Sequence, residues 1–91
     1  MTRAYLLTRP MCSACAEAQP IKGWLAMRGV EVVTYDVSTA AGLAGAAWLE
    51  LADLDLVPVL VLVDDERGEI CRYIGSVPPP AELRRVLMGL D

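Results

Sequence analysis

Histidine is absent from this chain of 91 residues. Its absence removes imidazole as a general acid or base and as a ligand for most transition-metal sites. Long apolar runs are also absent, since no stretch approaches the ~20 residues of a membrane-spanning helix. The first residues lack the apolar region and the cleavage site of a signal peptide. We therefore expect a cytoplasmic protein with no membrane partner.

Clusters of basic residues are missing as well, because no run of Lys and Arg is longer than Arg84-Arg85. The formal net charge is −4, whereas a nucleic-acid-binding surface needs an excess of positive charge. We expect no nucleic-acid partner. Three cysteines are an odd number, which argues against a disulfide-stapled secreted scaffold.

Apolar residues make up 55% of the chain, which is typical of a globular protein with a packed core. The length allows one domain with a modest core and leaves little room for a second. We predict a single domain over residues 1–91, present as a monomer.

Apolar patterns predict the order of the helices and strands. The expected elements are a strand at 3–8, a helix at 12–28, a strand at 31–37, a helix from a cap at Ser38 or Thr39 to about Ala52, strands at 59–63 and 69–74, and a helix at 81–90. Pro20 lies inside the first helix and should kink it, because proline lacks a backbone donor and clashes with the preceding turn. The aliphatic run at 59–63 indicates a strand that is covered on both faces.

Three patterns predict which side chains are buried. The first helix should bury the apolar side chains of one face, and the second helix also has apolar side chains available for burial. In the last strand, Ile70 and Arg72 should face one way, and Cys71 and Tyr73 the other. The expected buried helix residues are Ala14, Ala18, Ile21 and Leu25, then Leu43, Ala47, Trp48 and Leu51.

Cys12 and Cys15 form a Cys-x-x-Cys pair where the first strand passes into the first helix. Backbone N–H groups at the start of a helix have no partner within the helix, and together with the helix dipole they favour a thiolate. We predict that Cys12 attacks a disulfide and that Cys15 releases the mixed disulfide. Arg9 could add positive charge beside Cys12.

Other interpretations of the cysteines stay open. Cys12, Cys15 and Cys71 could hold zinc with a carboxylate, although structural zinc prefers four Cys or His ligands. The pair could also be two buried structural thiols. Cys71 is expected to be a small buried residue, or else the partner in a regulatory disulfide. Glu17 lies one turn beyond the pair and is expected to be solvated, and Trp24 is expected to pack.

Residues 8–15 have the sequence TRPMCSAC. This segment resembles the Thr/Ser-Lys/Arg-Pro-x-Cys-x-x-Cys segment of glutaredoxins and of the small redoxins that donate electrons to ribonucleotide reductase. The order of elements also resembles that of the thioredoxin superfamily over nearly the whole chain. The resemblance implies an α/β thioredoxin-like fold of order β-α-β-α-β-β-α, with a four-stranded mixed sheet flanked by three helices.

The same resemblance implies a substrate-binding surface. Val57-Pro58 stands where the family has a cis-proline before the third strand, so the Val57 backbone would pair with substrate and Pro58 would pack against the sulfurs. Met11, Val57 and Gly75 would border the groove and offer an apolar docking surface. With Arg9, these are the expected substrate-binding residues.

Some positions depart from the glutaredoxin pattern. Ser13-Ala14 replaces the aromatic residue that glutaredoxins usually carry in or beside the motif. Gly75-Ser76-Val77 lacks the second glycine and the acidic pair that hold glutathione. The buried Asp of thioredoxins would fall near Leu6 and is missing.

We therefore predict a thiol–disulfide oxidoreductase that reduces protein or small-molecule disulfides. No bound cofactor or metal is expected, and a reductase or glutathione, as co-substrate, would restore the dithiol. The alternatives are a glutathione-coupled glutaredoxin, a metal or iron–sulfur carrier on the same fold, and a non-catalytic binding module.

Overall fold

The computed structural model describes residues 1–51 and 55–89 and has a four-stranded mixed sheet of order β2-β1-β3-β4. β1 is parallel to β2 and antiparallel to β3, and β3 is antiparallel to β4. The elements are β1 (Thr2–Thr8), α1 (Ser13–Ala18), α2 (Pro20–Met27), β2 (Glu31–Asp36), α3 (Ala40–Trp48), β3 (Val59–Asp64), β4 (Gly68–Ile74) and α4 (Pro80–Met88). The predicted strands and their order are confirmed. The predicted helix ends at Ala52 and Leu90 fall outside the described residues.

The first predicted helix is divided into α1 and α2, which meet at Gln19. Pro20 is the first residue of α2. At that position the missing proline N–H breaks no bond of the new helix. The kink predicted at Pro20 is thus confirmed, and α1 and α2 together are the first of the three predicted helices.

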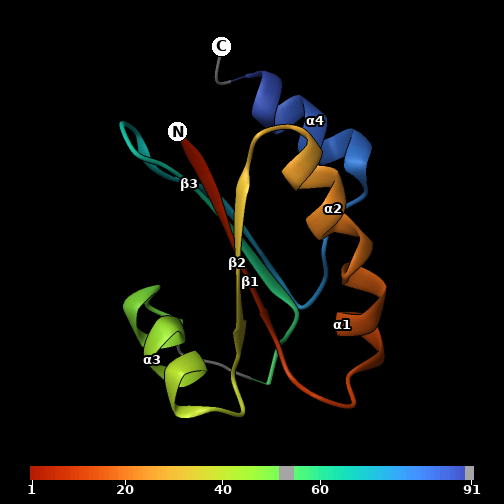
Figure 1. The fold of residues 1–91 in the computed structure, drawn as a ribbon, viewed down its shortest axis with the longest axis vertical. Coiled ribbons are helices and arrows are strands. Elements are labelled where there is room, and N and C mark those ends of the chain that lie inside the picture. The colour runs from red at the N-terminus through yellow and green to blue at the C-terminus, as the bar shows by residue number, and fades with distance from the viewer. Residues whose placement is uncertain (52–54, 90–91) are drawn as a thin grey trace.

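Helices cover both faces of the sheet (Figure 1). α3 lies on one face, and α1, α2 and α4 lie on the other. Two groups of buried residues follow this division. The α2 cluster consists of Ala4, Leu6, Ala18, Ile21, Leu25, Val30, Leu60, Leu62 and Leu83. The α3 cluster consists of Tyr5, Leu7, Cys15, Val37, Ala46, Leu49, Val57, Val59 and Val61.

The central strands β1 and β3 contribute alternate residues to the two clusters. Leu6 and Leu60 belong to the α2 cluster, whereas Leu7 and Val59 belong to the α3 cluster. All four side chains are almost fully buried. The expectation of a strand covered on both faces at 59–63 is therefore confirmed, and continuous apolar runs are typical of such strands.

α3 packs through a different face from the predicted one. Leu43 and Trp48 are 46% and 68% exposed, and the buried residues of the helix are Gly42, Gly45 and Ala46. The predictions for Leu43, Ala47 and Trp48 were wrong, and Leu51 is only half-buried.

The reason is a close approach of α3 to β2. A Cβ atom on Gly42 would lie 1.7 Å from the carbonyl oxygen of Asp36, and one on Gly45 would lie 2.7 Å from the Tyr35 ring. Only residues without a side chain permit this distance. The face of α3 that packs against the sheet is therefore determined by the small size of its residues and not by their hydrophobicity.

A β-bulge changes the expected alternation in β4. Leu62 pairs with Cys71 and Val63 pairs with Glu69, so Ile70 has no partner in the register. The extra residue shifts the pattern, as bulges do, and Ile70 packs against the α2 cluster together with Cys71 and Tyr73. The prediction that Ile70 shares a face with Arg72 was wrong.

Ala14 departs from its prediction because it is exposed, and Cys15 is the buried residue of that turn. The other predicted residues of this face, Ala18, Ile21 and Leu25, are buried as expected. In the described part of the chain, no helix combines the length and the apolar character needed to cross a bilayer.

Candidate active site

Cys12 and Cys15 lie at the beginning of α1 and are joined by a disulfide, with their Cα atoms 5.2 Å apart. Cys12 is the N-cap residue and has an extended backbone conformation. The backbone N–H of Cys15 donates a hydrogen bond to Cys12 Sγ over 3.1 Å. One of the N–H groups at the helix start is thus directed at the Cys12 sulfur.

The two sulfurs differ in accessibility. Cys15 is only 3% exposed and belongs to the α3 cluster, whereas Cys12 is half-buried. An incoming molecule therefore reaches Cys12 more readily than Cys15. This difference supports the roles predicted for the pair.

The chain before β3 lies beside Cys12. The Val57-Pro58 peptide bond is cis, as the resemblance implied. Cys12 Sγ lies 4.0 Å from the carbonyl oxygen of Val57. The backbone N–H of Gly75 donates a hydrogen bond to the carbonyl oxygen of Pro58 over 2.9 Å. The structure thereby brings Val57, Pro58 and Gly75 together with the cysteine pair.

Exposed apolar side chains accompany these residues. Met11 is fully exposed, and Leu56 and Ile74 are about half exposed. Met11 has a φ of 57°, in the left-handed region that non-glycine residues rarely adopt. Leu56 and Ile74 were not among the predicted site residues, although their positions directly before Val57 and Gly75 could have indicated them.

Arg9 forms an ion pair with Asp55, with Arg9 Nη1 3.6 Å from Asp55 Oδ1. Both side chains are exposed, so the pair adds little to stability. It connects the β1–α1 loop to the segment before Val57. The predicted effect of Arg9 on the Cys12 thiolate stays a prediction.

Cys71 is separate from the pair. It lies in β4 and packs against the α2 cluster, whereas Cys12 and Cys15 pack in the α3 cluster. Burial raises the pKa of the Cys71 thiol, which keeps it protonated at neutral pH. Within residues 1–51 and 55–89, His, Cys, Asp and Glu form no group of three that could hold a metal ion.

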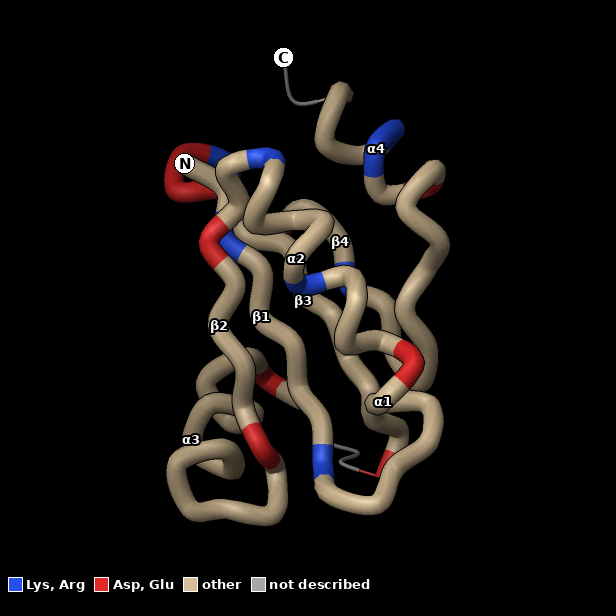
Figure 2. The backbone as a smooth tube through the Cα atoms, turned by 45° about the vertical axis from the view of Figure 1, so that its right-hand side comes forward, with Lys and Arg blue, Asp and Glu red and all other residues tan. Residues whose placement is uncertain are grey.

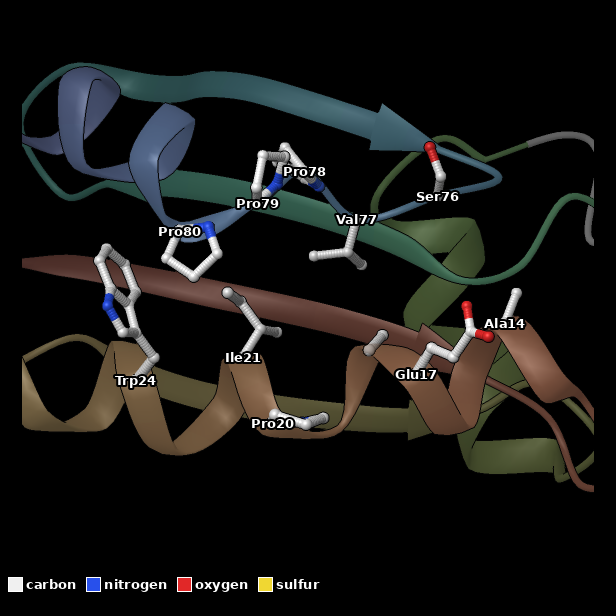
Figure 3. Close-up of a pocket in the computed structure, with 11 residues that line it drawn as sticks. Ala14, Glu17, Pro20, Ile21, Trp24, Ser76, Val77, Pro78, Pro79 and Pro80 are labelled. Carbon is white, nitrogen blue, oxygen red and sulfur yellow. The ribbon is translucent and has the colours of Figure 1, made fainter.

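A groove of about 420 Å³ lies between the helices α1 and α2 and the segment that follows β4 (Figure 3). One wall is formed by α1 and α2, from Ala14 to Trp24, and the other by the segment Ser76–Pro80. Trp24 was predicted to be a packing residue, and no site residue was predicted among Pro78–Pro80. The helical spacing of Ala14, Ile21 and Trp24 was the available indication of a common face.

Neither a protein-family model nor a curated protein sequence matches the chain. Solved structures match it closely. Thioredoxin O2 from Arabidopsis thaliana in the oxidised state superposes with a TM-score of 0.76 and 15% identity, over 99% of this chain and 75% of that one. Thioredoxin 1 from Thermosipho africanus gives 0.75 and 18%, over 97% of this chain and 92% of that one.

Mitochondrial thioredoxin 3 from Saccharomyces cerevisiae, in its oxidised form, gives a TM-score of 0.70 and 22% identity, over 97% of this chain and 77% of that one. These similarities establish the fold of the superfamily and do not distinguish its glutaredoxin-like branch. The chain therefore has a thioredoxin-like fold, with a Cys12–Cys15 disulfide at the beginning of α1.

Proposed function

We propose that this protein is a thiol–disulfide oxidoreductase that reduces disulfides of partner proteins. The observation that carries the proposal is the asymmetry of the disulfide. Cys12 caps α1, accepts the Cys15 N–H and is accessible, while Cys15 lies almost fully buried behind it. A partly accessible attacking sulfur beside a buried second sulfur is an arrangement suited to dithiol exchange.

The reaction begins with the reduced dithiol. The Cys12 thiolate attacks one sulfur of the substrate disulfide, a Cys12–substrate disulfide forms, and the other substrate sulfur leaves and takes up a proton. Cys15 then loses its proton and attacks Cys12 Sγ, and the second substrate sulfur leaves as a thiol. Two electrons and two protons pass to the substrate, and the Cys12–Cys15 disulfide is left.

Local hydrogen bonding favours the Cys12 thiolate in this scheme. A sulfur anion at Cys12 would receive the Cys15 N–H that already points at it, and hydrogen bonds to an ionised acceptor are stronger than those to a neutral one. The backbone carbonyl of Val57 lies close enough to accept the S–H of a protonated Cys12. The Cys15 N–H can therefore donate to the Cys12 thiolate, and the Val57 carbonyl can accept from the Cys12 thiol.

The features beside the pair favour a protein as the electron source over glutathione. Pro78–Pro80 supply no backbone N–H, and the groove carries a single charged residue, Glu17. Glutathione is anionic at neutral pH and needs donors or cations for its carboxylates. We propose that a cytoplasmic disulfide reductase, or another protein dithiol, restores the Cys12–Cys15 dithiol.

The test uses the prereduced protein and insulin disulfides as a substrate. Wild-type protein should reduce insulin. Cys12→Ser should bring the rate to background, and Cys15→Ser should accumulate a mixed disulfide on Cys12. Cys71→Ser is the matched control and should retain the wild-type rate. A Cys12→Ser variant with unchanged activity would refute the proposal.

The reductant is tested separately. The oxidised protein is incubated with NADPH and thioredoxin reductase, or with glutathione and glutathione reductase, and NADPH consumption is followed. We expect consumption in the first system only. Consumption only with glutathione would assign the protein to the glutathione-coupled alternative.

A further inference from the structure

The groove beside the disulfide is apolar along most of its length. Figure 3 shows Ile21 and Val77 on opposite walls, with Glu17 and Ala14 at one end and Trp24 at the other. Proline residues have no backbone N–H, so the wall formed by Pro78–Pro80 offers carbon atoms and carbonyl oxygens. Such a groove retains apolar side chains and gives little to a molecule that needs many hydrogen-bond donors.

One end of the groove is lined by Ala14, the residue between Cys12 and Cys15 in the chain, and the two cysteines themselves do not line the groove. From Ala14 to Trp24, ten residues of straight helix would extend about 15 Å, and the break between α1 and α2 at Gln19 makes this an upper limit. An extended polypeptide rises roughly 3.3 Å per residue, so this length matches about four or five residues. A substrate segment attached to Cys12 would enter the groove by passing Ala14.

Glu17 supplies the only charge in the lining. The ion pairs of the described residues do not include it. It is also the only acidic residue of α1, seen as the red segment of that helix in Figure 2. Its carboxylate is thus available to a cation that lies at the cysteine end of the groove.

We propose that this groove binds the segment that adjoins the reactive cysteine of a substrate protein, and that it selects an extended apolar segment with Lys or Arg facing Glu17. The inference rests on the proposed function, since the bound segment is the one that Cys12 attacks. It adds substrate selection to that reaction and no further chemical step. Segments with Asp or Glu at the same position are disfavoured by repulsion from Glu17.

The test compares two synthetic disulfide-linked peptides that have the same apolar residues beside cysteine and differ only in Lys against Glu. The value of kcat/KM for each peptide is divided by the kcat/KM for 2-hydroxyethyl disulfide, a small neutral disulfide. This ratio is the normalised rate. For wild-type protein, the normalised rate should be roughly three- to fivefold higher for the Lys peptide, the range of an exposed ion pair. The preference should shrink in high salt.

Glu17→Lys should reverse the preference between the two peptides. Glu66→Lys makes the same charge change in the exposed turn between β3 and β4 and is the matched control, so it should keep the wild-type preference. Val77→Asp should lower the normalised rates of both peptides, because it places a charge on the apolar wall.

The outcomes separate the two proposals. If wild-type protein reduces neither insulin disulfides nor 2-hydroxyethyl disulfide, the proposed function fails, and this inference fails with it. If it reduces that compound but shows no preference for the Lys peptide, or if Glu17→Lys and Glu66→Lys behave alike, only the inference about the groove is overturned.

Discussion

Single residues set the difference between the two sulfurs of the disulfide. Cys12 and Cys15 are the same chemical group three positions apart, yet one is accessible and receives an N–H, and the other is covered by the α3 cluster. The cap position of Cys12 follows from the strand-to-helix boundary in the sequence. The burial of Cys15 depends on residues distant in the chain, such as Val57 and Val59.

In the reduced protein, iodoacetamide should modify Cys12 first and Cys15 much more slowly. Because the Cys15 N–H stabilises the thiolate, the alkylation rate of Cys12 should reach half of its maximum at a lower pH than that of free cysteine, about 8.5. Mass spectrometry of digested samples over a pH series measures both sites. Equal rates at the two cysteines would contradict the assigned roles.

Cys71 provides an internal comparison for the same experiment. Burial raises the pKa of its thiol, so the thiolate fraction of Cys71 at pH 7 should be lower than that of free cysteine. We expect slower alkylation of Cys71 than of Cys12 at every pH below 8. Faster modification of Cys71 would indicate that β4 exposes this side chain in solution.

At the scale of elements, the contact between α3 and β2 depends on two glycines. We expect Gly42→Ala to lower the free energy of unfolding by about 1–3 kcal/mol, the usual cost of overpacking, because its Cβ would overlap the Asp36 carbonyl. Urea denaturation of the oxidised protein measures the change.

Gly23→Ala is the matched control for that experiment. Gly23 lies on the exposed side of α2, and a Cβ atom there would meet nothing within 4 Å. Alanine is the better helix former by about 1 kcal/mol, so this variant should be as stable as wild type or more stable. If the two substitutions had equal effects, close packing would not be the reason for the glycine at 42.

Across the whole molecule, several carboxylates are stabilised in the folded state. The side chain of Ser38 donates to Asp36 and holds its pKa below the usual value, the backbone N–H of Glu66 does the same for Asp64, and Arg72 for Glu69. A carboxyl with a lower pKa in the folded state stabilises the fold above its ordinary pKa of about 4. This contribution is lost as the pH falls through the folded-state pKa.

The thermal midpoint of the oxidised protein should therefore be lower at pH 3 than at pH 7. Circular dichroism melts at the two pH values measure the difference. Asp36→Asn removes one of the titrating groups and should show a smaller loss between them. An unchanged or higher midpoint at pH 3 would contradict this account.

The sequence by itself determined the order of the elements and the position of the reactive pair. Both depend on local properties: apolar periodicity, the proline at Pro20, and a Cys-x-x-Cys at a strand-to-helix boundary. The continuous apolar run of β3 also indicated burial on both faces, because such a strand has no polar side to turn to water.

Only the tertiary structure decided which surfaces meet. The packing face of α3 follows from how closely Gly42 approaches β2, and the bulge at Ile70 follows from pairing with β3. The groove exists because α1 and α2 lie beside the segment that follows β4, which brings Glu17 and Val77 together from opposite ends of the chain. Each of these features depends on the distance or the register between two packed elements, which no local sequence pattern records.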